Sequence, residues 1–174
     1  MNIVAFGTST SSTSINKALA TYAANLIKNA SVTILDLNDY KVPIFSEDKE
    51  KEIGKAAGAE QFLSDIGKAD ALIISFAEHN GHYPAAYKNL FDWATRIERK
   101  VYQNKPAVYL STSNGANGAS SVLAAASNSA NSFGSDIRAS ISVPKFLDNF
   151  DLDKGEVTNP SIITEITDAL NKLV

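Results

Sequence analysis

Residues 75–93 read SFAEHNGHYPAAYKNLFDW, and they follow the short apolar run ALII at residues 71–74. An apolar run of this length is typical of a buried strand in a parallel sheet. Asn80 and Gly81 indicate a turn, and Pro84 suits the first turn of a helix because proline lacks an N–H group. The stretch therefore predicts a strand, a polar loop and a helix, and open parallel sheets bind their ligands at loops of this kind.

Segments typical of strands and of helices alternate along the whole chain. We expect strands at residues 3–6, 32–35, 71–76, 107–110 and 137–143. We expect five helices, one after each strand. The first begins near Ile15, the second runs from the charged stretch at Glu47 through Ile66, and the third contains Trp93. The fourth ends at Gly134, and the fifth begins at Asn159-Pro160. Residues 144–158 are expected to connect the last strand to the last helix. This alternation predicts an α/β fold, a parallel sheet of strand order 2-1-3-4-5 with helices on both faces.

Composition favours one ordinary globular domain over residues 1–174, with 44% hydrophobic and 20% charged residues. With a net charge of −3, the chain has no overall positive electrostatic field that would attract nucleic acid. The absence of cysteine excludes disulfides, thiolate metal sites and cysteine nucleophiles. No apolar run approaches the roughly 20 residues that span a bilayer, and the first residues lack the features of a signal peptide. We therefore expect no membrane partner, no nucleic acid and a cytoplasmic location.

Three polar, glycine-containing loops follow the first, third and fourth expected strands, at residues 7–14, 77–81 and 111–118. In the order 2-1-3-4-5 these loops lie at the same end of the sheet, around the point where the strand order reverses. We therefore expect a ligand site where the three loops meet.

The first loop, GTSTSSTS at residues 7–14, contains seven serine or threonine residues and precedes a helix for which Ser14 is a plausible N-cap. Free N–H groups and the positive end of the helix dipole favour a phosphate there. Neither the Walker motif nor the Gly-x-Gly-x-x-Gly fingerprint of dinucleotide sites is present. A monophosphate is therefore the favoured ligand, and a flexible surface loop is the alternative.

The second loop and its helix resemble the NADPH-dependent FMN reductase family, which carries Pro-Glu-Tyr-Asn-Gly, a proline and then Leu-Lys-Asn-x-x-Asp-Trp. This chain keeps the family residues Glu78, Asn80, Gly81, Pro84, Lys88, Asn89, Asp92 and Trp93, and it departs at Ala77, His79 and Tyr87. The first loop is similar to the family's Gly-Ser-x-Arg and Ser-x-Asn-x-x-Leu through Gly7-Thr8, Ser14-Ile15-Asn16 and Leu19, but it is one residue longer and has no arginine.

The resemblance implies a flavodoxin-like three-layer fold that binds FMN, takes hydride from NAD(P)H and passes electrons to a small-molecule acceptor such as a flavin, a quinone or an azo dye. The flavin carries that chemistry, so no protein group is expected to act as catalyst. The expected cofactor-binding residues are Ser9, Ser14, Ile15, Asn16, Glu78, His79, Asn80, Gly81, Ser113 and Gly115. The resemblance also implies a homodimer, or a homotetramer, formed through the helix that contains Trp93.

Several alternatives stay open from the sequence alone. A flavodoxin-like electron carrier would share the fold, although such carriers dock through more acidic surfaces than a net charge of −3 provides. A phosphoryl-accepting receiver needs clustered acidic residues after the first strand, where Phe6-Gly7 stand. Ala77, His79 and the missing arginine motivate a further alternative, a family member that no longer binds flavin. Glu78 could equally begin a helix, and no metal is expected at His79 and His82, which lack cysteine neighbours.

Overall fold

The sheet of the molecule has the predicted topology. The computed structural model describes residues 1–173, and its five parallel strands lie in the order β2-β1-β3-β4-β5, which confirms the predicted α/β class and strand order. The strands are β1 Asn2–Gly7, β2 Ser31–Ile34, β3 Ala71–Phe76, β4 Lys105–Thr112 and β5 Ser135–Val143. Their register pairs Gly7 with Ser75 and Phe76 with Ser111. The loops after β1, β3 and β4 therefore start at the same level of the sheet.

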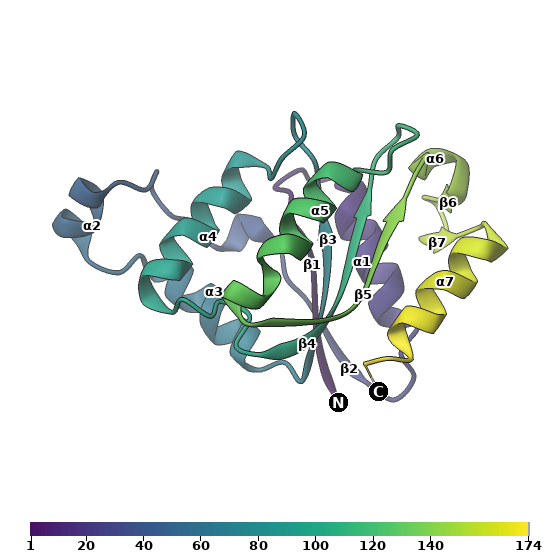
Figure 1. The fold of residues 1–174 in the computed structure, drawn as a ribbon, viewed down its shortest axis with the longest axis horizontal. Coiled ribbons are helices and arrows are strands. Elements are labelled where there is room, and N and C mark those ends of the chain that lie inside the picture. The colour runs from purple at the N-terminus through teal and green to yellow at the C-terminus, as the bar shows by residue number, and fades with distance from the viewer. Residues whose placement is uncertain (174) are drawn as a thin grey trace.

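Helices cover both faces of the sheet (Figure 1). The helices are α1 Ile15–Asn25, η1 Leu37–Asp39, α2 Glu47–Ile53, α3 Ala57–Gly67, α4 Ala85–Ile97, α5 Ser120–Ser129, η2 Ala130–Phe133, α6 Phe146–Asn149 and α7 Pro160–Leu170. Helices α1 and α7 pack on one face, and α3, α4 and α5 pack on the other. Among residues 1–173, no helix combines the length and the apolar character that a bilayer crossing requires.

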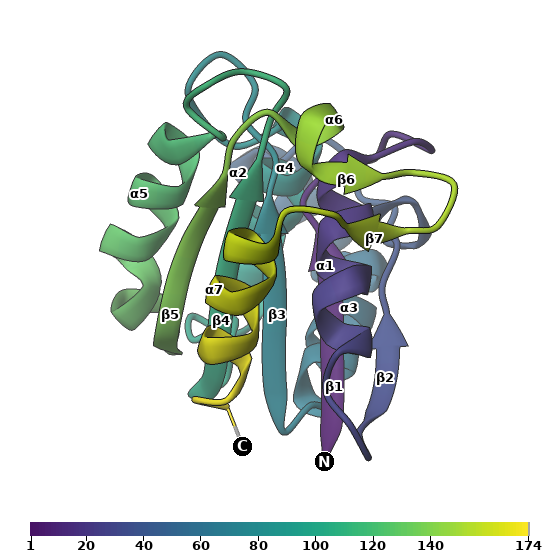
Figure 2. The ribbon, with the colours of Figure 1, turned by 90° about the vertical axis from the view of Figure 1, so that its right-hand side faces the viewer.

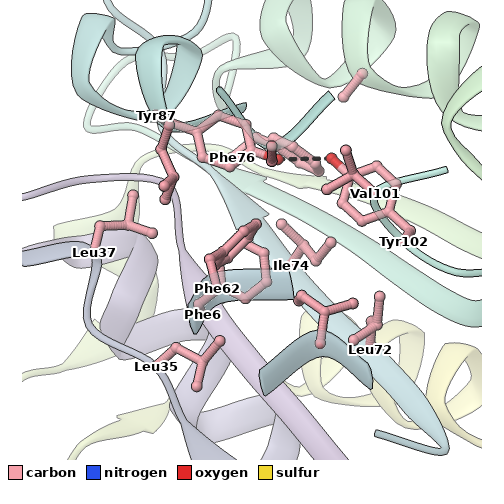
Figure 3. Packing of buried hydrophobic residues seen from close by; sticks show 14 of the residues in the cluster. Phe6, Leu35, Leu37, Phe62, Leu72, Ile74, Phe76, Tyr87, Val101 and Tyr102 are labelled. Atoms are coloured by element: carbon pink, nitrogen blue, oxygen red, sulfur yellow. Dashed lines mark hydrogen bonds between the residues drawn. The ribbon is translucent and has the colours of Figure 1, made fainter. Parts of the chain in front are cut away.

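Alternating residues of the buried strands supply the two cores, because successive side chains of a strand point to opposite faces. Phe6, Leu72 and Ile74 belong to the core beneath α3, α4 and α5, which Figure 3 shows, whereas Ile3 and Ile73 belong to the core beneath α1 and α7. The first of these cores contains most of the large buried aromatic side chains, among them Trp93, Tyr87 and Tyr109. A rigid sheet of this kind fixes the positions at which its loops begin.

The helix predicted from Glu47 through Ile66 is wrong as a single element. It divides into α2 and α3 at Gly54, which adopts φ +69°, a left-handed conformation that ends α2. Helix α2 has no buried residue and stands away from the body of the molecule (Figure 1). Its charged side chains are therefore largely solvated, as a stretch of this composition predicts.

The segment 144–158 contains more structure than a simple connection. It forms α6 and then a small antiparallel hairpin of β6 Phe150–Asp151 and β7 Glu156–Val157. Figure 2 shows this hairpin lying across the N-terminal half of α1, near the loop that follows β1. The segment thus adds a wall beside α1, which its sequence did not predict.

Candidate functional site

A cavity of about 230 Å³ lies at the carboxyl end of the sheet, and all three predicted loops line it. The predicted site residues that line it are Ser9, Ser14, Ile15, Asn16, Glu78, His79 and Ser113. The lining residues that were not among the predicted cofactor-binding residues are Ser11, Thr13, Ala77, Thr112 and Asn114. Asn80, Gly81 and Gly115 are exposed and are not part of its lining.

The wall formed by the first loop offers hydrogen-bond donors to a ligand. Ser14 caps α1 as predicted, because its Oγ accepts a hydrogen bond from the N–H of Lys17 at 3.1 Å. The N–H groups of Ile15 and Asn16 precede this bonded position, and within residues 1–173 they have no acceptor. They lie at the positive end of the helix dipole, where an anion is stabilised.

Lys17, the lysine in the first turn of α1, does not add a free positive charge to this wall. Its Nζ donates to the carboxylate of Asp36, with which it forms a half-buried ion pair. The hydrogen bond from Lys17 lowers the pKa of the Asp36 carboxyl below its ordinary value, so this carboxylate is ionised at neutral pH. An anion at the first loop would therefore be held by N–H groups and hydroxyls.

The side chain of Asn16 ties the loops to one another. Its Oδ1 accepts from the Ser75 hydroxyl at 2.7 Å and from the Thr112 N–H at 3.1 Å, and its Nδ2 donates to the Thr112 carbonyl at 3.1 Å. Thr8 makes a similar bridge, since its Oγ1 accepts from the Ala77 N–H at 2.9 Å. Asn16 lines the cavity, but its amide atoms are engaged within the protein, so its backbone N–H is the group that remains for a ligand.

The carboxylate of Glu78 has a partner in the next helix. It accepts a hydrogen bond at 2.9 Å from the N–H of Val122, in the first turn of α5. The residue that precedes this helix, Ala119, supplies no side-chain cap. The sequence left open whether Glu78 initiates a helix or contacts a ligand, and the structure shows the helix-initiating role. Its negative charge is also stabilised by the positive end of the helix dipole.

Residues 79–82 form a tight hairpin turn. The backbone of His79 exchanges two hydrogen bonds with that of His82, at 2.9 and 3.1 Å, and Asn80 and Gly81 both have positive φ, 52° and 81°. This is the conformation that an Asn-Gly pair favours in two-residue turns. His79 lines the cavity, whereas His82 lines a separate groove between α4 and α5.

Gly118 fixes the path of the third loop. Its φ is +55°, and a Cβ at this position would come within 2.4 Å of the Ser142 Oγ. Its carbonyl accepts from the Ser111 and Ser142 hydroxyls at 2.7 and 2.9 Å. Gly115 has no such constraint, because the nearest atom to an added Cβ would be the Ser113 Oγ at 3.7 Å.

Comparison with known proteins identifies relatives of this chain. A model of the NADPH-dependent FMN reductase family matches residues 1–147. The chain is 35% identical over 107 residues to a 2-hydroxy-1,4-benzoquinone reductase of Burkholderia sp, covering 60% of this chain and 56% of that one. It is 31% identical over 103 residues to an NAD(P)H-dependent FMN reductase of Pseudomonas aeruginosa, covering 59% and 54%. The chain thus spans about half the length of these curated relatives.

Solved structures share the fold over nearly the whole chain. The flavoenzyme FerB of Paracoccus denitrificans, an NAD(P)H:(acceptor) oxidoreductase, superposes with a TM-score of 0.79 at 21% identity, covering 99% of this chain and 94% of that one. An azoreductase of Bacillus anthracis superposes with a TM-score of 0.65 at 16% identity, covering 99% of each chain. The match to the family model, the topology and the three-loop cavity agree, and the chain belongs to the NADPH-dependent FMN reductase family.

Proposed function

We propose that residues 1–174 form one FMN-binding domain that acts as an NAD(P)H-dependent oxidoreductase. The observation that carries the proposal is the cavity in which the hydroxyl-rich loop meets the loops after β3 and β4. Bound FMN would supply the redox chemistry, accepting hydride from NAD(P)H and giving electrons to a second substrate. The chain itself would bind FMN, orient it and shield it from water.

The phosphate of FMN would lie at the N-terminal end of α1. The donors available to it are the N–H groups of Ile15 and Asn16 and the hydroxyls of Ser9 and Ser14. Each hydroxyl already accepts one backbone N–H, from Ser11 and Lys17, and it keeps its own hydrogen to donate. The donor set thus fits a monophosphate without a guanidinium.

The flavin ring would lie against the second and third loops. We assign the remaining contacts to Glu78, His79, Asn80, Gly81, Ser113 and Gly115. Glu78 and His79 of the second loop and Ser113 of the third loop line the cavity. His79 stands at the family's tyrosine position and offers a ring that can stack or donate a hydrogen bond. Because the carboxylate of Glu78 caps α5 and holds the second loop in position, the contact of Glu78 with the ring would be made by its backbone.

The second substrate that we propose is a small quinone or a related acceptor. Relatives of this chain carry the names 2-hydroxy-1,4-benzoquinone reductase and quinone reductase, the latter from Escherichia coli. We propose the cytoplasm as the site of this activity, because the hydride donor is an intracellular metabolite.

A test of the proposal compares FMN with riboflavin, which lacks the phosphate. Ser9→Asp should weaken FMN binding by about tenfold, because a carboxylate then lies beside the phosphate, and should leave riboflavin binding within twofold. Ser12→Asp is the matched control, since Ser12 belongs to the same loop but does not line the cavity. Titration of the flavin-free protein by calorimetry gives both affinities.

Turnover separates an enzyme from a carrier. FMN-loaded protein should oxidise NADPH continuously when a benzoquinone is present. Tight FMN binding with negligible turnover would support the electron carrier instead. Failure of the protein to bind FMN at all would overturn the proposal.

We also propose that the protein is a homodimer, or a homotetramer built from such dimers, with α4 at the interface. An aromatic groove of about 360 Å³ runs between α4 and α5 and is lined by Tyr83, Tyr87, Phe91 and Phe133. Aromatic side chains are enriched in interface cores. The resemblance to the family implies a homodimer, so we propose that a second copy of the chain fills this groove.

Oligomeric state tests this interface. Ala125→Glu should convert the dimer to a monomer in sedimentation velocity, because Ala125 lines the groove and a buried unpaired charge opposes association. Ala124→Glu should leave the dimer intact, since Ala124 is exposed and does not line the groove. If the two variants have the same oligomeric state, the groove between α4 and α5 is not the interface.

A further inference from the structure

Three asparagines of the chain are followed directly by glycine, in the pairs Asn80-Gly81, Asn114-Gly115 and Asn117-Gly118. All three pairs belong to the loops after β3 and β4, which project beyond the carboxyl end of the sheet (Figure 1). An asparagine before glycine is chemically labile, because glycine has no side chain to shield its backbone nitrogen from the asparagine side chain. Each pair is therefore a candidate site of modification.

The modification is deamidation, and its only co-reactant is water. The glycine nitrogen attacks the side-chain Cγ of the asparagine, so that a new N–C bond forms, the bond from Cγ to the side-chain nitrogen breaks, and ammonia leaves with the glycine's proton. Water then opens the resulting cyclic imide at either carbonyl and gives aspartate or isoaspartate. Both products carry a carboxylate where the asparagine had a neutral amide. The attack requires rotation about the bond between the asparagine Cα and its carbonyl carbon, so a pair whose backbone is held by hydrogen bonds should react slowly.

The Asn117-Gly118 pair is held on both sides of the bond that must rotate. The Asn117 carbonyl accepts hydrogen bonds from the Ser142 hydroxyl at 3.1 Å and from the Ser120 N–H at 3.0 Å. Gly118 is buried at φ +55°, and its N–H donates to the Gly115 carbonyl at 3.4 Å. This pair should react most slowly of the three.

The Asn80-Gly81 pair is exposed, but the turn that contains it restrains its backbone. Two backbone hydrogen bonds between His79 and His82 close that turn. Both central residues have positive φ, 52° and 81°, so rotation of the Asn80 backbone would open the turn. This pair should react at an intermediate rate.

The Asn114-Gly115 pair has neither kind of restraint. Both residues are exposed, and within residues 1–173 the Asn114 carbonyl and the Gly115 N–H have no hydrogen-bond partner. The loop is anchored on either side of this peptide unit, because the Ser113 and Gly115 carbonyls accept hydrogen bonds at 3.0 Å from the backbone of residues 145–146. The peptide unit between these anchors can therefore rotate while the loop stays attached.

We propose that Asn114 is a site of spontaneous deamidation, and that the carboxylate it gains weakens the binding of an anionic ligand where the three loops meet. Asn114 lines that cavity together with Ser113 and His79. This second part rests on the proposed function, in which the ligand is FMN and carries a phosphate. The protein would therefore lose affinity for FMN as it ages, at a rate set by the freedom of one peptide unit.

Peptide mapping by mass spectrometry tests the first part, on flavin-free protein incubated at mildly alkaline pH. Asn114 should convert to aspartate and isoaspartate about tenfold faster than Asn117, with Asn80 between them. In urea the three sites should convert at similar rates, because the unfolded chain has none of these restraints. Gly115→Ala should slow the conversion of Asn114 about tenfold and leave Asn80 unchanged, because a Cβ then shields the attacking nitrogen. If Asn114 converts no faster than Asn117 in the folded protein, the proposed site is wrong.

Calorimetric titration with FMN tests the second part. Asn114→Asp, which reproduces one of the two products, should weaken FMN binding about threefold, because it adds a negative charge to the cavity lining. Asn117→Asp is the matched control and should leave the affinity unchanged, since Asn117 is exposed but does not line the cavity. Equal affinity of Asn114→Asp and the unmodified protein would overturn the effect on the ligand. If neither protein binds FMN, the proposed function fails, and the peptide map still decides whether Asn114 deamidates.

Discussion

Replacing Asn16 with alanine should lower the free energy of unfolding by about 3 kcal/mol, which is large for one polar side chain. Asn16 is 3% exposed, and its amide bonds the Ser75 hydroxyl and both backbone groups of Thr112. Its removal leaves those three groups without their partner, and each unsatisfied buried polar group costs about 1–3 kcal/mol. A water molecule in the vacated space would recover part of this cost.

Urea denaturation of the two proteins measures the effect, and Asn25→Ala is the control. Asn25 lies in the same helix but is exposed, so its replacement should change stability by less than about 0.5 kcal/mol. Asn16→Ala should also weaken FMN binding about tenfold, because the amide holds α1 to the end of β4. A loss of stability below about 1 kcal/mol would mean that the amide does not tie the loops together.

The meeting of the three loops was predictable because it depends on strand order and not on side chains. Parallel strands joined by helices end at one edge of the sheet, and the polar loops after β1, β3 and β4 carry the clearest sequence signals in the chain. Ser9, His79 and Ser113 belong to these three loops and line one cavity, so the predicted meeting of the loops is confirmed. That these residues bind a cofactor stays a prediction.

The roles of individual side chains were less predictable, because they depend on partners distant in sequence. Asn16 bonds Thr112, which is 96 residues away, and nothing near either residue indicates the pairing. Glu78 bonds Val122, and only the lack of a good cap before α5 could have hinted at it. The break at Gly54 was signalled by glycine itself, whose left-handed conformation ends helices.

Hairpin β6–β7 was not predicted because its strands are two residues each, too short for a periodic pattern. The neighbouring Asp153-Lys154-Gly155 is a turn composition that the sequence does contain. A longer apolar alternation on either side would have been needed to recognise a hairpin there.

Replacing Gly7 with alanine should lower the free energy of unfolding by about 3 kcal/mol, although local propensity predicts the opposite sign. Gly7 is the last residue of β1, and inside a strand glycine is less favourable than alanine by about 0.5–1 kcal/mol, so propensity alone predicts a gain of at most this size. A Cβ on Gly7, however, would lie 2.4 Å from the backbone nitrogen of Lys17 and 2.7 Å from the carbonyl carbon of Asn16. Backbone atoms cannot swing aside, so α1 would have to move off the sheet.

Steric strain should exceed the gain from propensity, because overpacking a core typically costs about 1–3 kcal/mol and here the neighbour is a helix backbone. For a chain of this length, 3 kcal/mol corresponds to a fall of roughly 10 °C in Tm, which differential scanning calorimetry resolves. FMN affinity should fall about tenfold as well, because the displaced helix carries the N–H groups of Ile15 and Asn16. Gly115→Ala is the control: its added Cβ would meet only the Ser113 Oγ, at 3.7 Å, so stability should stay within about 0.5 kcal/mol. A stabilised Gly7→Ala protein would show that α1 is not held against the end of β1, and the proposed phosphate position would then be wrong.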